Sequence, residues 1–323
     1  MSEDQSFLIL KDLHVNFELR AGVLQALRGI NLTVDNGETV GVVGESGSGK
    51  SVMAKEIIRL NPSPPARTRG QILLDGVDVV SLPKGDLRNI RGSKASMIFQ
   101  EPMTSLNPVF TIGQQITAGI RTHLKLTKVQ ANELAAELLG KVGIPSAKER
   151  LKQYPHELSG GMRQRVMIAM ALSCNPNLLI ADEPTTALDV TIQDQILELL
   201  AATIQDNKMS MILISHDLYV VADTCEKIVV MYAGCQMEVG PTEEVFNNPR
   251  HPYTIGLKES QPSIGGGQSK YLKPIPGTVP DMLNVPSGCA FHPRCSYAID
   301  ICKTETPELE TKGRNLSTAC HVM

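Results

Sequence analysis

The feature that most constrains this chain is the segment Gly-Glu-Ser-Gly-Ser-Gly-Lys-Ser at residues 44–51. Two glycines bracket four residues and are followed by lysine and serine, which is the phosphate-loop pattern. In such a loop, backbone N–H groups at the start of a helix surround the negative charges of a triphosphate, and glycines let the backbone approach closely. The flanks fit, because residues 38–43 predict a short buried strand and residues 52–60 predict a helix. A Gly/Ser-rich turn that matches by chance is the alternative, and the order of strand, loop and helix disfavours it.

The expected contacts with a nucleoside triphosphate follow from this pattern. Lys50 is expected to reach the β- and γ-phosphates, and the Ser51 hydroxyl is expected to hold Mg²⁺. The rest of the expected nucleotide contacts lie in the same loop, at Gly44, Glu45, Ser46, Gly47, Ser48 and Gly49.

Composition excludes several other classes of protein. Lysine and arginine total 31 against 34 acidic residues, so no basic excess indicates a nucleic-acid partner. No run of 18 apolar residues is present, and the polar, acidic N-terminus is not expected to be a secretory signal. A length of 323 residues suits one large α/β domain with an appendage.

The hydrophobic pattern predicts a β-rich start, a helical middle and a return to strands. Strands are expected at residues 8–10, 13–17, 30–34, 71–76, 95–100, 178–183 and 211–217, with a turn at 35–37. Residues 101–165 predict a helical insertion, in which Leu134, Leu138, Leu139 and Val142 share one helix face. A last hairpin near residues 228–232 and a helix pair at 241–257 follow.

Several polar residues stand where apolar runs end, at positions suited to phosphate chemistry. Asp182 and Glu183 follow one run, His216 follows another, and Gln100 ends an earlier strand. Residues 158–161, Leu-Ser-Gly-Gly, open a further helix. Taken singly, a strand-ending carboxylate pair is often a turn, Ser-Gly-Gly is usually a flexible loop, and such a histidine is more often a surface residue.

Taken together, these features resemble an ABC-transporter ATPase over residues ~7 to ~260. The resemblance lies in their order and approximate spacing: the phosphate loop, Gln100, residues 158–161, Asp182-Glu183-Pro184, Ala187-Leu188-Asp189 and His216. It implies that Asp182 and Gln100 join Ser51 around Mg²⁺, and that Glu183 orients or deprotonates the attacking water. It also implies that His216 contacts the γ-phosphate. Ser159, Gly160 and Gly161 would complete the nucleotide site of a partner ATPase, with the helix dipole directed at its γ-phosphate.

The residue that stacks on adenine is left open. Phe17 is the nearest aromatic candidate at the end of the first strand, and it serves equally well as a core residue.

The C-terminal part has a different composition. Residues 260–287 are rich in Gly and Pro and predict a linker or an extended wrap. Four cysteines follow, separated by five, six and seventeen residues: Cys289, Cys295, Cys302 and Cys320. Disulfides do not suit a protein that needs cytosolic ATP, and zinc usually takes closer cysteine pairs, whereas an iron–sulfur cluster tolerates irregular spacing. The chemistry alone leaves zinc and a cluster open.

This tail resembles the C-terminal module of dipeptide and oligopeptide permease ATPases. The similar segments are residues 288–302, 306–309 and 319–321, together with residues 103–108, 184–191 and 250–254. The resemblance implies a [4Fe–4S] cluster on Cys289, Cys295, Cys302 and Cys320. It predicts an α/β P-loop ABC ATPase at residues 1–259, with an N-terminal antiparallel β part and a helical subdomain at about 101–165. A linker and a small cysteine-rich extension are predicted at 260–323.

The resemblance also implies a function. It predicts an ATP-hydrolysing subunit, with ATP and Mg²⁺, that powers import of dipeptides or oligopeptides from the cytoplasmic face of the membrane. The expected partners are a second, related ABC ATPase, two transmembrane permease subunits and an extracytoplasmic substrate-binding protein. Nickel complexes and oligosaccharides remain alternative substrates. A soluble ABC ATPase acting on translation factors or DNA is less favoured, because the chain has one signature, no heptad stretch and no basic patch.

Overall fold

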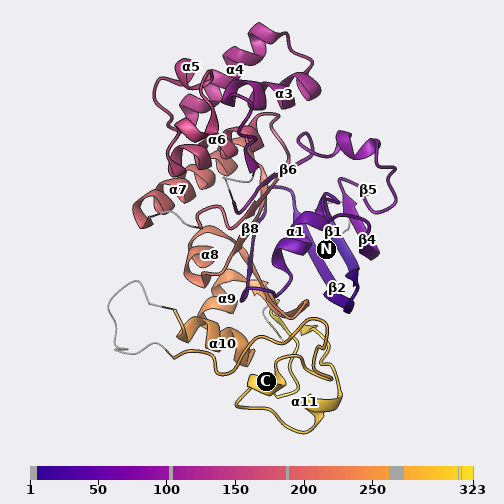
Figure 1. Cartoon of the computed structure of the whole chain (residues 1–323). Helices are drawn as coiled ribbons and strands as arrows, with labels where there is room; N and C mark the ends of the chain where they lie inside the picture. The colour runs from indigo at the N-terminus through magenta and orange to yellow at the C-terminus, as the bar shows by residue number, and fades with distance from the viewer. Residues whose placement is uncertain are drawn as a thin grey trace. The chain divides into compact units, whose positions relative to one another are not determined.

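The computed structural model describes residues 6–101, 105–186, 189–261, 273–311, 313 and 315–322. The chain forms two compact units, which are described separately (Figure 1). The first contains Met1–Ser81 and Leu213–Met323, and is called the loop unit because it carries the phosphate loop. The second, Leu82–Ile212, is called the helical unit. The domain boundaries expected from the sequence, at residue 259 and around 101–165, remain a prediction.

The loop unit begins with an antiparallel sheet in the order β2-β1-β4-β5. Its strands are β1 (Ser6–Leu19), β2 (Gly22–Asp35), β4 (Ala66–Leu74) and β5 (Val77–Asp78). The two short strands expected at 8–10 and 13–17 are one strand, because Asp12 takes a φ of 46° and shifts the register without ending the pairing. The expected turn at 35–37 is present, with Gly37 at a φ of 78°.

The rest of the loop unit surrounds the phosphate loop. Parallel strands β3 (Thr39–Val43) and β9 (Lys227–Tyr232) are almost wholly buried, as their apolar sequences require, and β9 forms the expected hairpin with β10 (Cys235–Pro241). The helices are α1 (Lys50–Ile57), α8 (Leu218–Thr224), α9 (Thr242–Asn247) and α10 (Pro252–Glu259). The last two are the expected helix pair.

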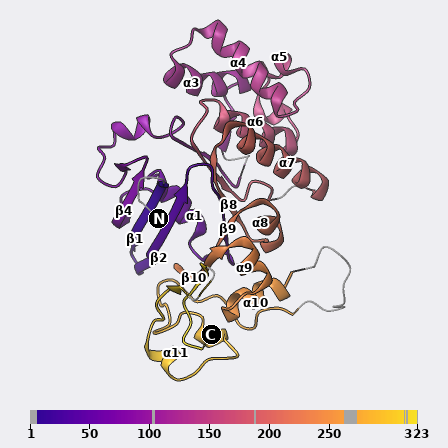
Figure 2. The same ribbon diagram turned by 180° about the vertical axis from the view of Figure 1, so that it is seen from behind.

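The C-terminal segment of the loop unit has little regular structure. Residues 273–287 contain no helix or strand, and short elements follow: η4 (His292–Arg294), α11 (Ile301–Thr304), β11 (Glu310–Thr311) and β12 (Ser317–Thr318). Strand β12 pairs with β10, so the segment continues the strand order β11-β12-β10-β9-β3. Both ribbon views show it beside α10 (Figures 1 and 2).

The helical unit contains the predicted insertion. Strand β6 (Ala95–Ile98) pairs in parallel with β7 (Leu178–Asp182), and β8 (Ser210–Ser215) crosses the chain boundary between the units. The other elements are η2 (Asp86–Asn89), α3 (Ile112–Leu124), α4 (Lys128–Lys141), α5 (Ala147–Arg150), η3 (Pro155–Glu157), α6 (Gly160–Leu172) and α7 (Val190–Asn207).

The buried face of α4 differs from the predicted one. It is centred on the small residues Ala131 and Ala135 together with Leu139 and Val142, whereas Leu134 and Leu138 are only half-buried. Close packing of α4 on α3 and α6 selects alanines where the sequence pattern favoured leucines. None of the helices in the described ranges combines the length and apolar character needed to cross a bilayer.

Candidate nucleotide site

The phosphate loop runs from the end of β3 to the start of α1, as predicted. Gly44 and Gly49 have φ values of 153° and 101°, which side chains rarely allow. A Cβ atom on Gly44 would lie 2.2 Å from the carbonyl oxygen of Met231, so the loop passes too close to β9 for any larger residue. The glycines of the motif are therefore required by backbone conformation and by packing.

Lys50 is the first residue of α1 and is buried. Its Nζ donates hydrogen bonds to the carbonyl oxygens of Gly44 and Glu45, at 2.6 and 3.0 Å. The ammonium is thus held against the loop itself. Ser48 is also buried, and its carbonyl accepts a hydrogen bond from Gly234, which joins the loop to the β9–β10 turn.

Glu45 has partners that the sequence did not indicate. Its carboxylate pairs with Arg294 of the C-terminal segment, and its backbone N–H donates to the Tyr253 hydroxyl at 2.7 Å. Glu45 and Arg294 are 249 positions apart, so no local pattern could have paired them.

In the helical unit, the structure brings Gln100 and Glu183 together. Nε2 of Gln100 donates to Oε2 of Glu183 at 2.8 Å, and the Thr186 hydroxyl donates to the same oxygen at 2.9 Å. Asp182, at the end of β7, is buried. Glu183 has a φ of 46°, a conformation that is uncommon for a residue with a long side chain, so the turn after β7 holds this carboxylate in a strained backbone position.

Gln164 of α6 is a second residue that the sequence analysis missed. It is buried, and its Nε2 donates to the carbonyl oxygen of Pro184. The helix that begins at the Leu-Ser-Gly-Gly segment is therefore tied to the turn carrying Glu183. A glutamine inside a helix gives no local signal of such a contact. The neighbouring predicted residues Ala187 and Leu188 lie outside the described ranges, as do residues 102–104.

Ser159 and Gly160 lie at the exposed N-terminus of α6. The Ser159 hydroxyl caps the helix by accepting a hydrogen bond from the Met162 N–H at 3.3 Å. A Cβ atom on Gly160 would meet no other atom within 4 Å, whereas one on Gly161 would lie 3.3 Å from Ile192. The segment thus presents an exposed helix N-terminus, which favours negative charge.

His216 follows β8, as predicted, in the turn before α8. Its carbonyl oxygen accepts a hydrogen bond from Nε2 of Gln261 at 2.7 Å, and Oε1 of Gln261 accepts one from the Leu218 N–H. Asp217 caps α8. Gln261, just beyond α10, therefore shapes the histidine turn, and nothing in the sequence around it indicated this.

The four C-terminal cysteines are neighbours within the loop unit. The Cys289 N–H donates to the Cys302 carbonyl at 2.9 Å. Burial, with the nearby thiols of Cys302, Cys320 and Cys295, raises the pKa of Cys289 to about 11. All seven cysteines of the chain are free thiols, and no group of three or more His, Cys, Asp or Glu side chains in the described ranges is placed to hold a metal ion.

Comparison with known proteins finds relatives for both the part with the phosphate loop and the C-terminal part. A family model for the ABC transporter matches residues 27–186, and one for the oligopeptide/dipeptide transporter, C-terminal region, matches residues 237–302. The oligopeptide transport ATP-binding protein OppD of Bacillus subtilis is 51% identical over 94% of this chain and 85% of its own length. The dipeptide transport ATP-binding protein DppD of the same organism is 47% identical, over 98% and 94%.

A solved structure agrees with the fold. The ATP-binding cassette MJ0796, a dimer in a post-hydrolysis state bound to ADP and Pi, has a TM-score of 0.65 and 28% identity, covering 73% of this chain and 98% of its own. This chain therefore belongs to the ABC transporter family, as an ATP-binding subunit of its oligopeptide/dipeptide branch.

Proposed function

We propose that this chain binds and hydrolyses ATP to power the import of dipeptides or oligopeptides through a membrane permease. The observation that carries the proposal is the coexistence of the phosphate loop with the oligopeptide/dipeptide transporter C-terminal region in one chain. The relatives named for peptide transport match over nearly the whole chain, which supports peptides over nickel complexes or oligosaccharides as the cargo.

The residues of the ATP site have separate roles in this proposal. Lys50 binds the β- and γ-phosphates, and Ser51 and Asp182 hold Mg²⁺, which neutralises phosphate charge. Family membership supports the action of these two residues on one metal ion, and the hydroxyl and carboxylate oxygens suit Mg²⁺. His216 contacts the γ-phosphate.

Glu183 activates the attacking water, and Gln100 assists it. The hydrogen bonds from Gln100 and Thr186 support this role, because they fix one carboxylate oxygen and leave the orientation of the group defined. In this proposal Gln100 also changes partners when a metal ion or a water enters.

Two such ATPases act together, each completing the other's site. The exposed N-terminus of α6, with Ser159, Gly160 and Gly161, supports binding to the γ-phosphate on a partner subunit. The dimer of the MJ0796 cassette supports the same arrangement. The partner in this branch is a related, different ATPase.

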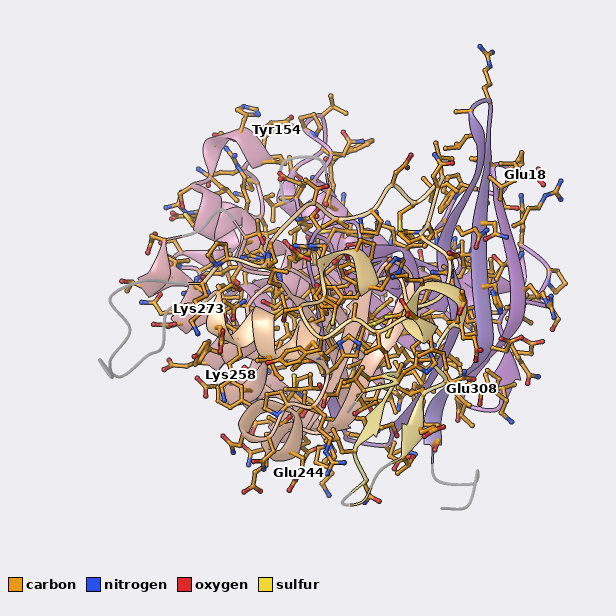
Figure 3. The ribbon with its side chains drawn as sticks, turned by 90° about the horizontal axis from the view of Figure 1, so that it is seen from below. Glu18, Tyr154, Glu244, Lys258, Lys273 and Glu308 are labelled. Atoms are coloured by element: carbon orange, nitrogen blue, oxygen red, sulfur yellow. The ribbon has the colours of Figure 1, made fainter. Side chains whose placement is uncertain are left out.

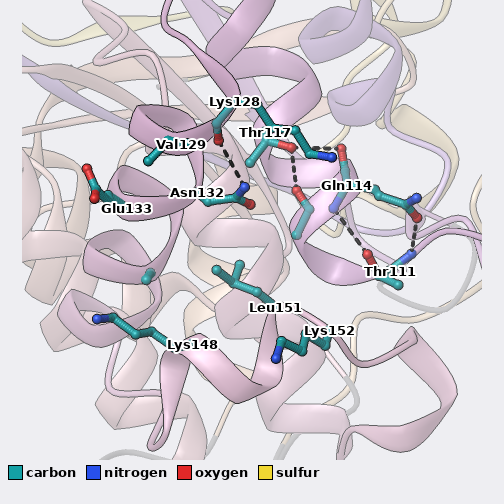
Figure 4. A pocket seen from close by; sticks show the side chains of 12 residues that line it. Thr111, Gln114, Thr117, Lys128, Val129, Asn132, Glu133, Lys148, Leu151 and Lys152 are labelled. Atoms are coloured by element: carbon teal, nitrogen blue, oxygen red, sulfur yellow. Dashed lines mark hydrogen bonds between the residues drawn. The ribbon is translucent and has the colours of Figure 1, made fainter.

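The helical unit contacts the permease at the cytoplasmic face of the membrane. A pocket of about 670 Å³ lies between α3, α4 and α5, lined by Thr111, Gly113, Gln114, Thr117, Lys128, Val129, Asn132, Glu133, Ala136, Lys148, Leu151 and Lys152 (Figure 4). Val129 is 67% exposed at its rim, so the pocket offers apolar surface to a partner segment. A substrate-binding protein outside the cell delivers the peptide to that permease.

The four C-terminal cysteines hold a [4Fe–4S] cluster in this proposal. The number of cysteines supports it, since four thiolates are what such a cluster takes, and Cys289 and Cys295 have other thiols of the set nearby. The free thiols fit the group in number and chemistry but are not placed to hold a metal ion in the described structure, so binding would need them to move together and lose their protons. The cluster would cross-link a segment with few regular elements.

Reconstitution tests the proposal. The chain, its partner ATPase, the permease and the binding protein are placed in liposomes, and ATP hydrolysis is measured with dipeptides, oligopeptides, a nickel chelate or an oligosaccharide. Peptides are expected to stimulate hydrolysis, with uptake of labelled peptide. Stimulation by the nickel chelate or the oligosaccharide alone would contradict the peptide assignment, and hydrolysis unaffected by any cargo would contradict the transport role.

A further inference from the structure

Glu45 puts a carboxylate in a loop that has to bind phosphates. It follows the first glycine of the motif, and its own backbone belongs to the expected binding surface. A negative charge at this position repels a triphosphate unless another group neutralises it. Lys50 of the loop donates to the backbone carbonyls of Gly44 and Glu45. The charge of the Glu45 carboxylate is therefore neutralised from outside the loop.

Arg294 of the C-terminal segment neutralises that carboxylate. Its Nη1 and Nη2 donate to the two carboxylate oxygens of Glu45 at 2.6 and 3.0 Å, a two-point contact. The side chain of Arg294 is 5% exposed and that of Glu45 is 27% exposed. Burial of this kind strengthens the interaction and also makes the loss of either partner costly.

The guanidinium is fixed on all its remaining sides. Nε donates to the carbonyl of Pro276 at 2.8 Å, and the two terminal nitrogens also reach the Tyr232 hydroxyl and the Ile275 carbonyl, at 3.3 and 3.4 Å. An arginine with this many partners has one position, and so has the carboxylate it binds.

A cluster of three aromatic rings supports the pair. Tyr232 from β9, Tyr253 from α10 and Phe291 from the C-terminal segment pack with ring centroids 4.7 to 5.3 Å apart, and all three are buried. Arg294 lies beside two of the rings, 5.8 Å from Tyr232 and 6.0 Å from Phe291. The Tyr253 hydroxyl also accepts the backbone N–H of Glu45. The backbone of Glu45 is therefore bound by one ring of the cluster, and its carboxylate by the arginine beside the other two.

The position of Arg294 depends on the cysteine-containing turns. It ends the short helix η4, between Cys289 and Cys295. The carbonyl of Cys289 accepts hydrogen bonds from the backbone and the ring of His292, and the backbone N–H of Cys289 donates to the Cys302 carbonyl. The segment that places the guanidinium is thus the one that brings the four thiols together.

We propose that Arg294 is a positioning residue for the nucleotide site: it neutralises Glu45 and fixes the phosphate loop, so that nucleotide affinity depends on the fold of the C-terminal segment. The proposal rests on the phosphate loop being the nucleotide site, as proposed above. It gives the C-terminal segment a role inside the ATPase chain itself.

Binding measurements with four variants test it. The Kd for ATP is measured by calorimetry on the full chain carrying Arg294→Met, Glu45→Gln, both changes, or Arg294→Lys. Arg294→Met leaves the carboxylate unpaired and is expected to weaken ATP binding about tenfold. Glu45→Gln removes the charge, so the double variant is expected to return to within about threefold of the wild type. Arg294→Lys keeps the charge and loses the two-point contact, and should fall between these.

A second ion pair in the same unit is the matched control. Arg67 of β4 and Glu18 of β1 pair at 3.2 Å, with side chains 70% and 54% exposed (Figure 3 labels Glu18). Arg67→Met should leave the Kd for ATP within about twofold of the wild type, since exposed pairs contribute little. Thermal unfolding without nucleotide is recorded for every variant.

The outcomes separate the possibilities. An Arg294→Met variant that unfolds at a lower temperature but binds ATP as the wild type does would show a purely structural pair and overturn the proposal. Equal weakening in Arg294→Met and in the double variant would overturn it too, because the carboxylate would then be irrelevant. If Arg294→Met does not fold, the lysine variant decides by the same criterion. Lys50→Ala tests the nucleotide site itself. Unchanged ATP binding in Lys50→Ala would reject the phosphate-loop assignment. Weakened ATP binding in Lys50→Ala together with wild-type binding in Arg294→Met would reject only this inference.

Discussion

The phosphate loop and the C-terminal segment lie in the same unit but are built by different means. The loop is eight consecutive residues between a buried strand and a helix, and its shape follows from glycines such as Gly44 and from the elements on either side. The C-terminal segment has strands of two residues and a helix of four, and depends on single side chains such as Phe291, Arg294 and Leu316. A site made by local backbone geometry is visible in sequence, whereas one made by distant side chains is not.

The largest expected effect is at Glu183, which, like the phosphate loop, belongs to a turn that directly follows a buried strand. Glu183→Gln keeps the shape of the turn and its bond with Gln100 but removes the base, so ATP hydrolysis by the assembled transporter should fall roughly 10²–10⁴-fold. ATP binding should persist and the dimer should stay closed. Steady-state hydrolysis and nucleotide retention check this, with Lys50→Ala as the contrasting variant, which should weaken binding itself. Hydrolysis near the wild-type rate would remove Glu183 from the mechanism.

The next effect tests whether the exposed start of α6 serves a partner. The isolated chain should hydrolyse ATP slowly, and activity should rise with the cognate ATPase and permease. Ser159→Arg would place a bulky cation at the exposed helix N-terminus, and should lower hydrolysis by the complex about tenfold or more while leaving ATP binding to the isolated chain unchanged. A loss of ATP binding in the isolated variant would instead indicate that the segment acts on its own chain.

The positions of these residues in the fold were predictable because they stand at the ends of regular elements. Asp182 ends a buried strand, Ser159 caps a helix, and the turn residues could be located from hydrophobic pattern alone. The residues that fix the neighbouring turns by hydrogen bonds to their backbone carbonyls were not predictable. Gln164 reaches Pro184 across two elements, and Gln261 reaches His216 from beyond α10, and neither leaves a periodic or spacing signal. The same holds for Arg294, whose partner is 249 positions away.

A smaller effect is expected where the cysteines are changed. Cys302→Ser should abolish the iron and sulfide content of anaerobically purified protein, because a cluster needs its fourth thiolate. It should also weaken ATP binding about threefold, because the C-terminal segment that loses its cross-link carries Arg294. Cys174→Ser, in the helical unit, is the matched control. One zinc per chain in place of iron would reject the cluster and keep the site, and four freely alkylated thiols in folded, metal-free protein would reject both.

The last prediction concerns His251, which links α10 to the end of the chain. Its Nδ1 accepts the Tyr253 N–H at 3.0 Å, and its ring also bonds to the backbone of Ala319, next to Cys320. Burial lowers the pKa of His251 from 6.5 to about 4. As the pH falls below 6.5, His251 becomes protonated in the unfolded chain but stays neutral in the folded chain until about pH 4. The free energy of unfolding therefore decreases as the pH falls from 6.5 to about 4.

His251→Asn separates this contribution from the others. Asparagine can still cap α10 but does not titrate. The raised pKa of the buried Glu238 carboxyl, which accepts the backbone N–H of residue 251, acts in the opposite direction in both proteins. Between pH 7 and pH 5 the wild type should lose about 2 kcal/mol more of its free energy of unfolding than the variant. Urea unfolding followed by tyrosine fluorescence suits the measurement, because the chain has no tryptophan and Tyr232 and Tyr253 lie in the affected cluster. Parallel pH profiles for the two proteins would mean that burial does not hold His251 neutral in the folded chain.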